Sequence, residues 1–326
     1  MRSRVGGIVG LAALIALASG VALGWRWGAT TIADQRADEL ADMTRQRDDV
    51  LERLAAQRPL LRQEALHPSE RALEEMFAMF PAKHPLGDWS PADSRFEDCW
   101  FPSLDELQLH GWLLWRPNPR AAVLHIHGNA GNLTHRAWLA ELLHDEFDCS
   151  VLIFDYRGYG RSEGTPTLDG LVRDARAARD ELARRQGIEP SQVVLQGESL
   201  GGAVAVQLAA EDGARGLVLE NTFSSLREAA SSHWPPALVR LVVSNRLDSR
   251  TAIRNYRGPL LQRHGTADSV IPYASGEALF REANQPKRFV MARGGEHNDP
   301  PPPEFLKALG EFLGALPAPS SEPAGP

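Results

Sequence analysis

From residue 121 onward the chain alternates short apolar stretches with longer amphipathic ones, and this alternation limits the folds it can adopt. Short apolar strands separated by helices form a mostly parallel sheet whose two faces are covered by helices. Strands are predicted at residues 121–126, 150–155, 193–196, 216–220, 260–264 and 288–292. Helices are predicted at residues 133–147, 169–186, 200–210 and 305–316. The predicted fold class is therefore α/β.

Two further segments, residues 96–101 and 107–115, alternate apolar and polar side chains and predict an antiparallel pair of strands before this region. In mostly parallel sheets, ligands bind at the carboxyl ends of the strands, where the loops begin. Functional side chains are therefore expected in the loops that follow the predicted strands.

The loop after the strand at 193–196 contains a candidate nucleophile. Residues 197–201 read GESLG, which matches G-x-S-x-G. About one chain in ten of this length and composition would contain the pattern by chance, so its surroundings decide its meaning. It follows an apolar strand and begins a helix rich in alanine and valine, the context of a sharp turn that exposes a serine hydroxyl. Ser199 is the predicted nucleophile; a serine that only caps the helix is the alternative.

A serine hydroxyl needs a base, and with this type of turn the acid and the histidine follow the serine in that order. Asp268 lies in a loop after an apolar strand and is the predicted acid, which would hold the imidazole in one tautomer. His297 is the only histidine after Asp268 and is the predicted general base. Glu220 is the alternative acid, and His264 is interpreted as a residue that ends a strand.

Acyl transfer also needs hydrogen-bond donors for the developing oxyanion. The backbone N–H of Leu200, directly after the candidate nucleophile, is one predicted donor. The second is expected in the loop at residues 127–132, which reads HGNAGN. Gly128 permits a tight turn there, and the Asn129 N–H is the predicted donor; a polar turn without chemistry is the alternative. His127 is interpreted as structural, because it precedes Ser199 and the role of base is already filled.

Residues 1–27 have the features of a membrane segment. Residues 5–24 carry no charge and, as a helix, would reach roughly 30 Å, the thickness of the hydrocarbon core of a bilayer. Trp25 and Trp27 follow, where an aromatic belt would lie. A transmembrane anchor is predicted. The alternative is a cleaved signal peptide, with residues 16–18 as the small-residue site.

The orientation of this segment is only weakly specified. Arg2 and Arg4 precede it and Arg26 and Arg36 follow it, so the bias under the positive-inside rule is small. With the short N-terminal tail inside, a single-pass anchor would place the following domain on the extracytoplasmic side. Cleavage as a signal peptide would instead give a secreted or periplasmic protein.

Three further regions follow the anchor. Residues 28–80 predict a helical stalk, either a solvated helix or a short coiled coil, because Leu40, Met43 and Val50 lie near a heptad seam that Arg47 interrupts. Residues 81–316 are the predicted catalytic domain. Residues 317–326 are rich in proline, serine and alanine and predict a disordered tail.

Charge and cysteine content exclude other classes of protein. The formal net charge of −7 argues against a nucleic-acid partner, since phosphate binding needs a cationic surface. The two cysteines, Cys99 and Cys149, have neither metal-type nor redox-type spacing and are interpreted as small buried residues. A disulfide between them could form only if the domain is exported. Neither a metal nor a cofactor is predicted.

Six ordered motifs together resemble a known family. They are HGNAGN at 127–132, DYRGYG at 155–160, QGESLGG at 196–202, ENTFS at 220–224, HGTADSVIP at 264–272 and HND at 297–299. Over residues 96–316 the chain resembles the α/β-hydrolase superfamily, in the branch of membrane-anchored abhydrolase-domain serine hydrolases. The resemblance implies the α/β-hydrolase fold with Ser199, Asp268 and His297 as the triad. It also supports Asn129 and Leu200 as oxyanion donors.

The resemblance further implies an activity and a lid. The expected reaction is hydrolysis of a carboxylic ester or thioester of a small or lipid-like acyl substrate; the alternatives are a peptidase or amidase of the same fold, and a non-catalytic membrane-tethered scaffold. A small lid is expected between residues 220 and 259. Its Trp234 and the apolar residues 238–243 would line an acyl pocket or, alternatively, pack into the core.

Overall fold

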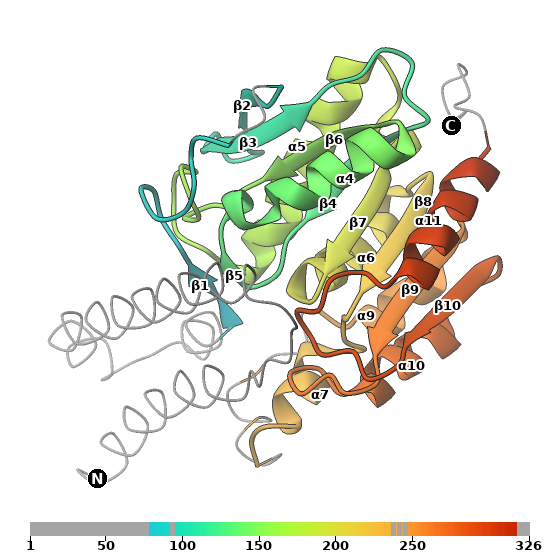
Figure 1. Cartoon of the computed structure of the whole chain (residues 1–326). Helices are drawn as coiled ribbons and strands as arrows, with labels where there is room; N and C mark the ends of the chain where they lie inside the picture. The colour runs from blue at the N-terminus through green and yellow to red at the C-terminus, as the bar shows by residue number, and fades with distance from the viewer. Residues whose placement is uncertain (1–77, 92–94, 236–238, 240–242, 244–246, 318–326) are drawn as a thin grey trace, which may run out of the picture. The chain divides into compact units, whose positions relative to one another are not determined.

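The computed structural model describes residues 78–91, 95–235, 239, 243 and 247–317 (Figure 1). The predicted membrane segment, the stalk up to residue 77, the tail from residue 318 and most of residues 236–246 in the predicted lid lie outside the described residues. Among the residues that are described, no helix is both long and apolar enough to cross a bilayer.

The centre of the described structure is an eight-stranded sheet of order β10-β9-β8-β7-β4-β6-β3-β2. The strands are β2 (Glu97–Pro102), β3 (Gln108–Leu114), β4 (Ala121–Ile126), β6 (Cys149–Phe154), β7 (Val194–Glu198), β8 (Gly216–Glu220), β9 (Leu260–Gly265) and β10 (Lys287–Ala292). Only β3 runs antiparallel to its neighbours, β2 and β6, and the other pairs are parallel. The predicted mostly parallel sheet is confirmed.

Helices cover both faces of this sheet (Figure 1). They are α4 (Ala137–Phe147), α5 (Leu168–Gln186), α6 (Leu200–Asp212), α7 (Leu226–Ser231), α9 (Ser249–Ala252), α10 (Tyr273–Glu282) and α11 (Pro303–Ala315). Short 3₁₀ turns are η1 (Leu133–Arg136), η2 (Pro190–Gln192) and η3 (Ile253–Asn255). Figure 1 shows α4 and α11 in front of the sheet and α5 and α6 behind it.

The core explains why these segments adopt these elements. Buried Val123, Val151 and Val194 alternate with residues of the other face and pack against Leu143 of α4 and Phe305 of α11 in one apolar cluster. Strands whose residues are buried on both faces favour apolar side chains, which is why β4, β6 and β8 appear in the sequence as short, mostly apolar stretches.

Several elements were not predicted from the sequence. Helix α10, whose buried positions include Ser275 and Gly276, was not predicted, and neither were the short helices α7 and α9. The predicted helix at 133–147 begins with the 3₁₀ turn η1, because Asn132 caps this turn with its side chain. Two short strands, β1 (Phe80–Pro81) and β5 (Ala130–Gly131), lie outside the large sheet.

Candidate active site

Ser199 forms the single-residue turn between β7 and α6, with φ 51° and ψ −120°. A side chain in this backbone region is strained, so neighbouring groups must hold it there. The Ser199 N–H donates to Glu220 O at 2.9 Å, and the Thr222 hydroxyl donates to Ser199 O at 2.7 Å. The strand end and loop of β8 therefore hold both backbone polar groups of Ser199, in the geometry of a nucleophile elbow.

Glycines let this turn approach the end of β4. A Cβ atom at Gly201 would lie 2.0 Å from Ile126 O, which excludes any side chain at that position. A Cβ atom at Gly128 would lie 3.5 Å from the Cβ of Ser199, which is ordinary van der Waals contact. The loop after β4 therefore lies directly beside Ser199.

Asp268 and His297 are hydrogen-bonded to each other. His297 Nδ1 lies 2.8 Å from Asp268 Oδ2. Strands β7, β9 and β10 are parallel in one sheet, so the loops that carry Ser199, Asp268 and His297 all begin at the same sheet edge. The structure thus brings the predicted acid and base together, while their catalytic roles stay predictions.

The Asp268 carboxylate is surrounded by donors. Its Oδ1 accepts the N–H groups of Val270 at 2.9 Å and Ile271 at 2.8 Å. Burial alone would raise the pKa of Asp268, but hydrogen bonds from His264 and His297 outweigh burial and hold this pKa well below its usual range. The carboxylate is therefore ionised at neutral pH and can stabilise an imidazolium.

Side chains from neighbouring loops fix the loop that carries the base. Asn221 Nδ2 donates to His297 O at 2.5 Å, and the Gly265 N–H donates to Asn221 Oδ1 at 3.0 Å. The Ser269 hydroxyl donates to Glu296 Oε2 at 3.0 Å. These bonds join the loops after β8, β9 and β10, so the position of the imidazole depends on all three.

The alternative acid, Glu220, is already committed to other partners. Gln196 Nε2 donates to Glu220 Oε1 at 2.7 Å, and Arg263 Nε donates to Glu220 Oε2 at 2.5 Å. Within the described part of the chain, neither carboxylate oxygen of Glu220 is hydrogen-bonded to His297. This geometry favours Asp268 as the acid and gives Glu220 the role of holding β7, β8 and β9 together.

Three buried side chains hold the carbonyl groups of the loop after β4. The Tyr156 hydroxyl donates to His127 O at 2.9 Å. The Tyr159 hydroxyl donates to Asn129 O at 2.7 Å. His127 Nδ1 donates to Gly128 O at 2.7 Å. Burial lowers the pKa of His127 to about 3, so the ring is neutral and its proton lies on Nδ1.

These contacts leave the predicted oxyanion donors available. In a trans peptide the N–H points away from the C=O, so holding Gly128 O directs the Asn129 N–H to the opposite side. Within the described residues, the Asn129 N–H has no hydrogen-bond acceptor. The Leu200 N–H lies in the first turn of α6, where no acceptor exists inside the helix.

The residue before Ser199 ties the turn to the same loop. The Gly128 N–H donates to Glu198 Oε1 at 3.2 Å, and Arg136 Nε donates to the same oxygen at 2.7 Å. Burial alone would raise the pKa of Glu198, but the positive charge of Arg136 holds this pKa well below its usual range. Glu198 is therefore ionised and fixes the loop against the nucleophile turn.

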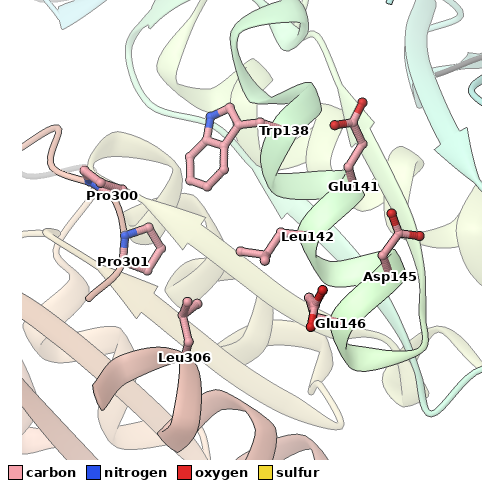
Figure 2. A pocket seen from close by; sticks show the side chains of 8 residues that line it. All are labelled: Trp138, Glu141, Leu142, Asp145, Glu146, Pro300, Pro301 and Leu306. Carbon is pink, nitrogen blue, oxygen red and sulfur yellow. The ribbon is translucent and has the colours of Figure 1, made fainter. Parts of the chain in front are cut away.

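A surface groove of about 370 Å³ lies between α4 and the segment that leads into α11 (Figure 2). Trp138 and Leu142 of α4 face Pro300, Pro301 and Leu306, with three acidic side chains of α4 beside them. None of the predicted catalytic or oxyanion residues lines this groove. It is not the candidate active site.

Known proteins are similar to this chain. Residues 117–255 match the family model described as serine aminopeptidase, S33. An uncharacterized protein of Mycobacterium tuberculosis is 37% identical over 223 residues, which cover 68% of this chain and 79% of that protein. The α/β-hydrolase domain-containing protein WAV2 of Arabidopsis thaliana is 34% identical over 224 residues, covering 63% of this chain and 73% of the relative. The chain belongs to the α/β-hydrolase superfamily.

Solved structures share the fold of this α/β-hydrolase. An esterase of Pyrococcus furiosus has a TM-score of 0.61 at 20% identity, covering 73% of this chain and 98% of that chain. An acetyl xylan esterase from Paenibacillus has a TM-score of 0.55 at 18% identity, covering 70% of this chain and 87% of that chain. At these identities the likeness concerns the fold.

The sequence did not indicate every residue around the site of this α/β-hydrolase. Tyr156 and Tyr159 belong to the DYRGYG motif, which carries the resemblance but suggested no role for either hydroxyl. His264 was interpreted as a strand end, yet its Nε2 lies 3.3 Å from Asp268 Oδ2. The partners of Tyr156 and Tyr159 lie on a different loop, the one after β4, whereas His264 and Asp268 lie within the single motif HGTADSVIP.

Proposed function

We propose that this α/β-hydrolase is a serine hydrolase that cleaves a carboxylic ester or thioester of a small or lipid-like acyl substrate. The hydrogen bond between His297 and Asp268, at the sheet edge where Ser199 occupies a strained turn, is the observation that carries the proposal. The esterases of similar fold support an ester substrate by analogy.

In the proposed reaction, Ser199 Oγ attacks the acyl carbon while His297 Nε2 accepts the hydroxyl proton. The oxyanion formed accepts hydrogen bonds from the Asn129 and Leu200 N–H groups. His297 then gives its proton to the departing alcohol or thiol, which leaves an acyl-enzyme on Ser199. Water, deprotonated by His297, attacks the acyl carbon and releases the acid. Asp268 keeps the Nδ1 proton of His297 in place and stabilises the imidazolium.

A peptidase or amidase is the second candidate. The family model that matches residues 117–255 is described as a serine aminopeptidase, which favours this candidate. The same nucleophile, base and oxyanion donors would serve either bond, because the difference lies in the leaving group and the substrate pocket. A non-catalytic scaffold is the third candidate.

A panel of acyl substrates separates the three candidates. The purified chain should hydrolyse p-nitrophenyl esters and acyl thioesters, with kcat/KM varying along an acyl series from two to sixteen carbons. Aminoacyl p-nitroanilides should react at least about a hundredfold more slowly than the best ester if the chain is an esterase.

Two outcomes of this panel would contradict the proposal. Faster cleavage of the anilides would assign the chain to the peptidases. An absence of turnover together with an absence of fluorophosphonate labelling would favour the scaffold. Heat-denatured protein assayed in parallel corrects for spontaneous hydrolysis of the esters.

We further propose that residues 1–27 remain as a single membrane anchor, followed by a helical stalk over residues 28–80 and an extracytoplasmic catalytic domain. The uncharged length of residues 5–24 and the tryptophans after it support an anchor over a cleaved signal peptide. An anchor would also hold the site close to lipid-like substrates.

Fractionation of expressing bacteria tests this anchor. The full chain is expected to stay in the membrane pellet after an alkaline carbonate wash, and a variant lacking residues 1–27 should move to the soluble fraction. A soluble form with a new N-terminus near Ser19 would instead establish signal-peptide cleavage. Protease digestion of intact spheroplasts reports orientation: degradation of the catalytic domain is expected, and its protection would place the domain in the cytoplasm.

A further inference from the structure

The Asp268 carboxylate receives a second imidazole, that of His264. This residue lies in β9 and is fully buried. Its Nε2 lies 2.9 Å from Ile271 O and 3.3 Å from Asp268 Oδ2. A carbonyl oxygen can only accept a hydrogen bond, so Nε2 carries the proton and donates it to Ile271 O, with Asp268 Oδ2 at 3.3 Å from the same nitrogen. Asp268 Oδ2 therefore faces N–H groups from two histidines, His264 and His297.

The other nitrogen of the His264 ring, Nδ1, makes no comparable contact. Within the described residues, His264 Nδ1 has no hydrogen-bond partner. It faces α10, where a Cβ atom at Gly276 would lie 2.2 Å from it. A buried nitrogen without a partner costs free energy that an apolar side chain of similar size would avoid. An apolar side chain could not make the contacts that Nε2–H makes with Ile271 O and Asp268 Oδ2. These contacts are therefore what an imidazole provides at this position.

We propose that His264 is a positioning residue that holds Asp268 in the orientation in which it accepts the Nδ1 proton of His297. The inference rests on the proposed serine-hydrolase function. His264 acts from within a strand of the sheet, whereas His297 is carried by a loop. The carboxylate therefore keeps its orientation even when the loop of the base moves. Two backbone amides hold Oδ1 by hydrogen bonds, and the Nε2–H of His264 lies 3.3 Å from Oδ2, so the carboxylate is oriented before it accepts the proton of His297.

The nearby N–H of His264 also changes the charge that His297 experiences. Its positive end lies close to Asp268 Oδ2 and stabilises part of the negative charge of the carboxylate, so the carboxylate attracts the proton of an imidazolium less strongly. The other groups around the ring are Tyr273 of α10, at 5.9 Å between centroids, and Met291, its neighbour on β10. On β8, the nearest ionised group is Glu220, which Arg263 neutralises.

Two substitutions separate the donor from the bulk of the ring. His264→Leu removes the N–H but fills the site, and His264→Gln places an amide N–H where Nε2 lies. We expect His264→Leu to lower kcat about tenfold to a hundredfold with KM changed less than about threefold. The pH profile of kcat/KM should change on its acidic limb, and His264→Gln should restore both kcat and this limb towards wild type.

His110 provides a matched control. It too is fully buried, its Nε2 lies 2.7 Å from Asp98, and its Nδ1 has no partner within the described residues. His110→Leu removes an equivalent imidazole from β3 and should leave kcat and the acidic limb within about twofold and 0.1 unit of wild type. Wild-type kcat and acidic limb in His264→Leu would overturn the proposal, as would a His264→Gln variant no better than His264→Leu.

A readout without turnover keeps this inference distinct from the proposed function. In the wild-type chain, the Nδ1 proton of His297 should give a low-field proton NMR signal that Asp268→Asn removes. In His264→Leu this signal should shift or broaden, and in His110→Leu it should not. A wild-type chain that hydrolyses no substrate but shows this pattern would refute the proposed function alone. An unchanged signal in His264→Leu would refute the positioning role alone.

Discussion

Ser199→Ala is expected to abolish ester hydrolysis and covalent labelling by a fluorophosphonate, while the chain stays folded. The hydroxyl is the only group in the proposed mechanism that bonds to the acyl carbon, so kcat should fall by about five to six orders of magnitude. The residual rate would come from the oxyanion donors and from substrate binding alone. Stopped assays with purified protein and a fluorescent fluorophosphonate measure both effects.

The backbone of Ser199 offers a second variant for this test. Alanine at φ 51° and ψ −120° is strained as serine is, whereas glycine adopts this conformation without penalty. Ser199→Gly should therefore be as inactive as Ser199→Ala but should melt at a higher temperature, by an amount that corresponds to about 1 kcal/mol. A Ser199→Ala protein that still labels at the wild-type rate would show that another residue is the nucleophile.

Asp268→Asn is expected to lower kcat by about three to four orders of magnitude. An amide that donates to Nδ1 would stabilise the wrong imidazole tautomer, and it would remove the charge that stabilises the imidazolium. Because the pKa of Asp268 lies well below its usual range, this carboxylate should not titrate within the assayed pH range. Steady-state kinetics from pH 5 to 9 measure both the loss of kcat and the pH profile.

Glu220→Gln is the comparison for this prediction. The substitution leaves the buried guanidinium of Arg263 without its charged partner, so the unfolding temperature should fall. The folded fraction should nevertheless keep kcat within about tenfold of wild type, because no hydrogen bond joins Glu220 to His297 in the described structure. If Glu220→Gln lost more activity than Asp268→Asn, the acid would be Glu220.

Most of the sheet and the candidate nucleophile could be predicted because their signals are local. An apolar stretch of five or six residues specifies a buried strand whatever its neighbours, and the predicted strand at 216–220 agrees with β8 residue for residue. The GESLG turn is likewise specified over a few residues, since strand, serine and helix are consecutive. Helix α10 was not predicted, because two of the residues that it buries, Ser275 and Gly276, are not strongly apolar, and the close contact of Gly276 with His264 of β9 exists only in the folded sheet.

The residues around the nucleophile were decided by tertiary structure. In the sequence, Glu220 and Asp268 are both carboxylates that follow apolar strands, and nothing local distinguishes them. The sheet places Arg263 beside Glu220, and it places the loop after β10, which carries His297, beside Asp268. Only these neighbours show that Glu220 belongs to an ion pair and that Asp268 is the partner of the predicted base.

The contacts of the oxyanion loop and of His264 could not be predicted from the sequence either. The sequence by itself determined the fold class, the position of Ser199 and the candidates for acid, base and donors, because strand patterning and turn chemistry act within a few residues. The conformation of the loop after β9 decides that Asp268 turns back to His264, four residues before it. Tertiary structure decided that Tyr156 and Tyr159 hold the oxyanion loop. A hydrogen bond between distant segments depends on where the backbone places both partners, and that placement is a property of the packed sheet as a whole.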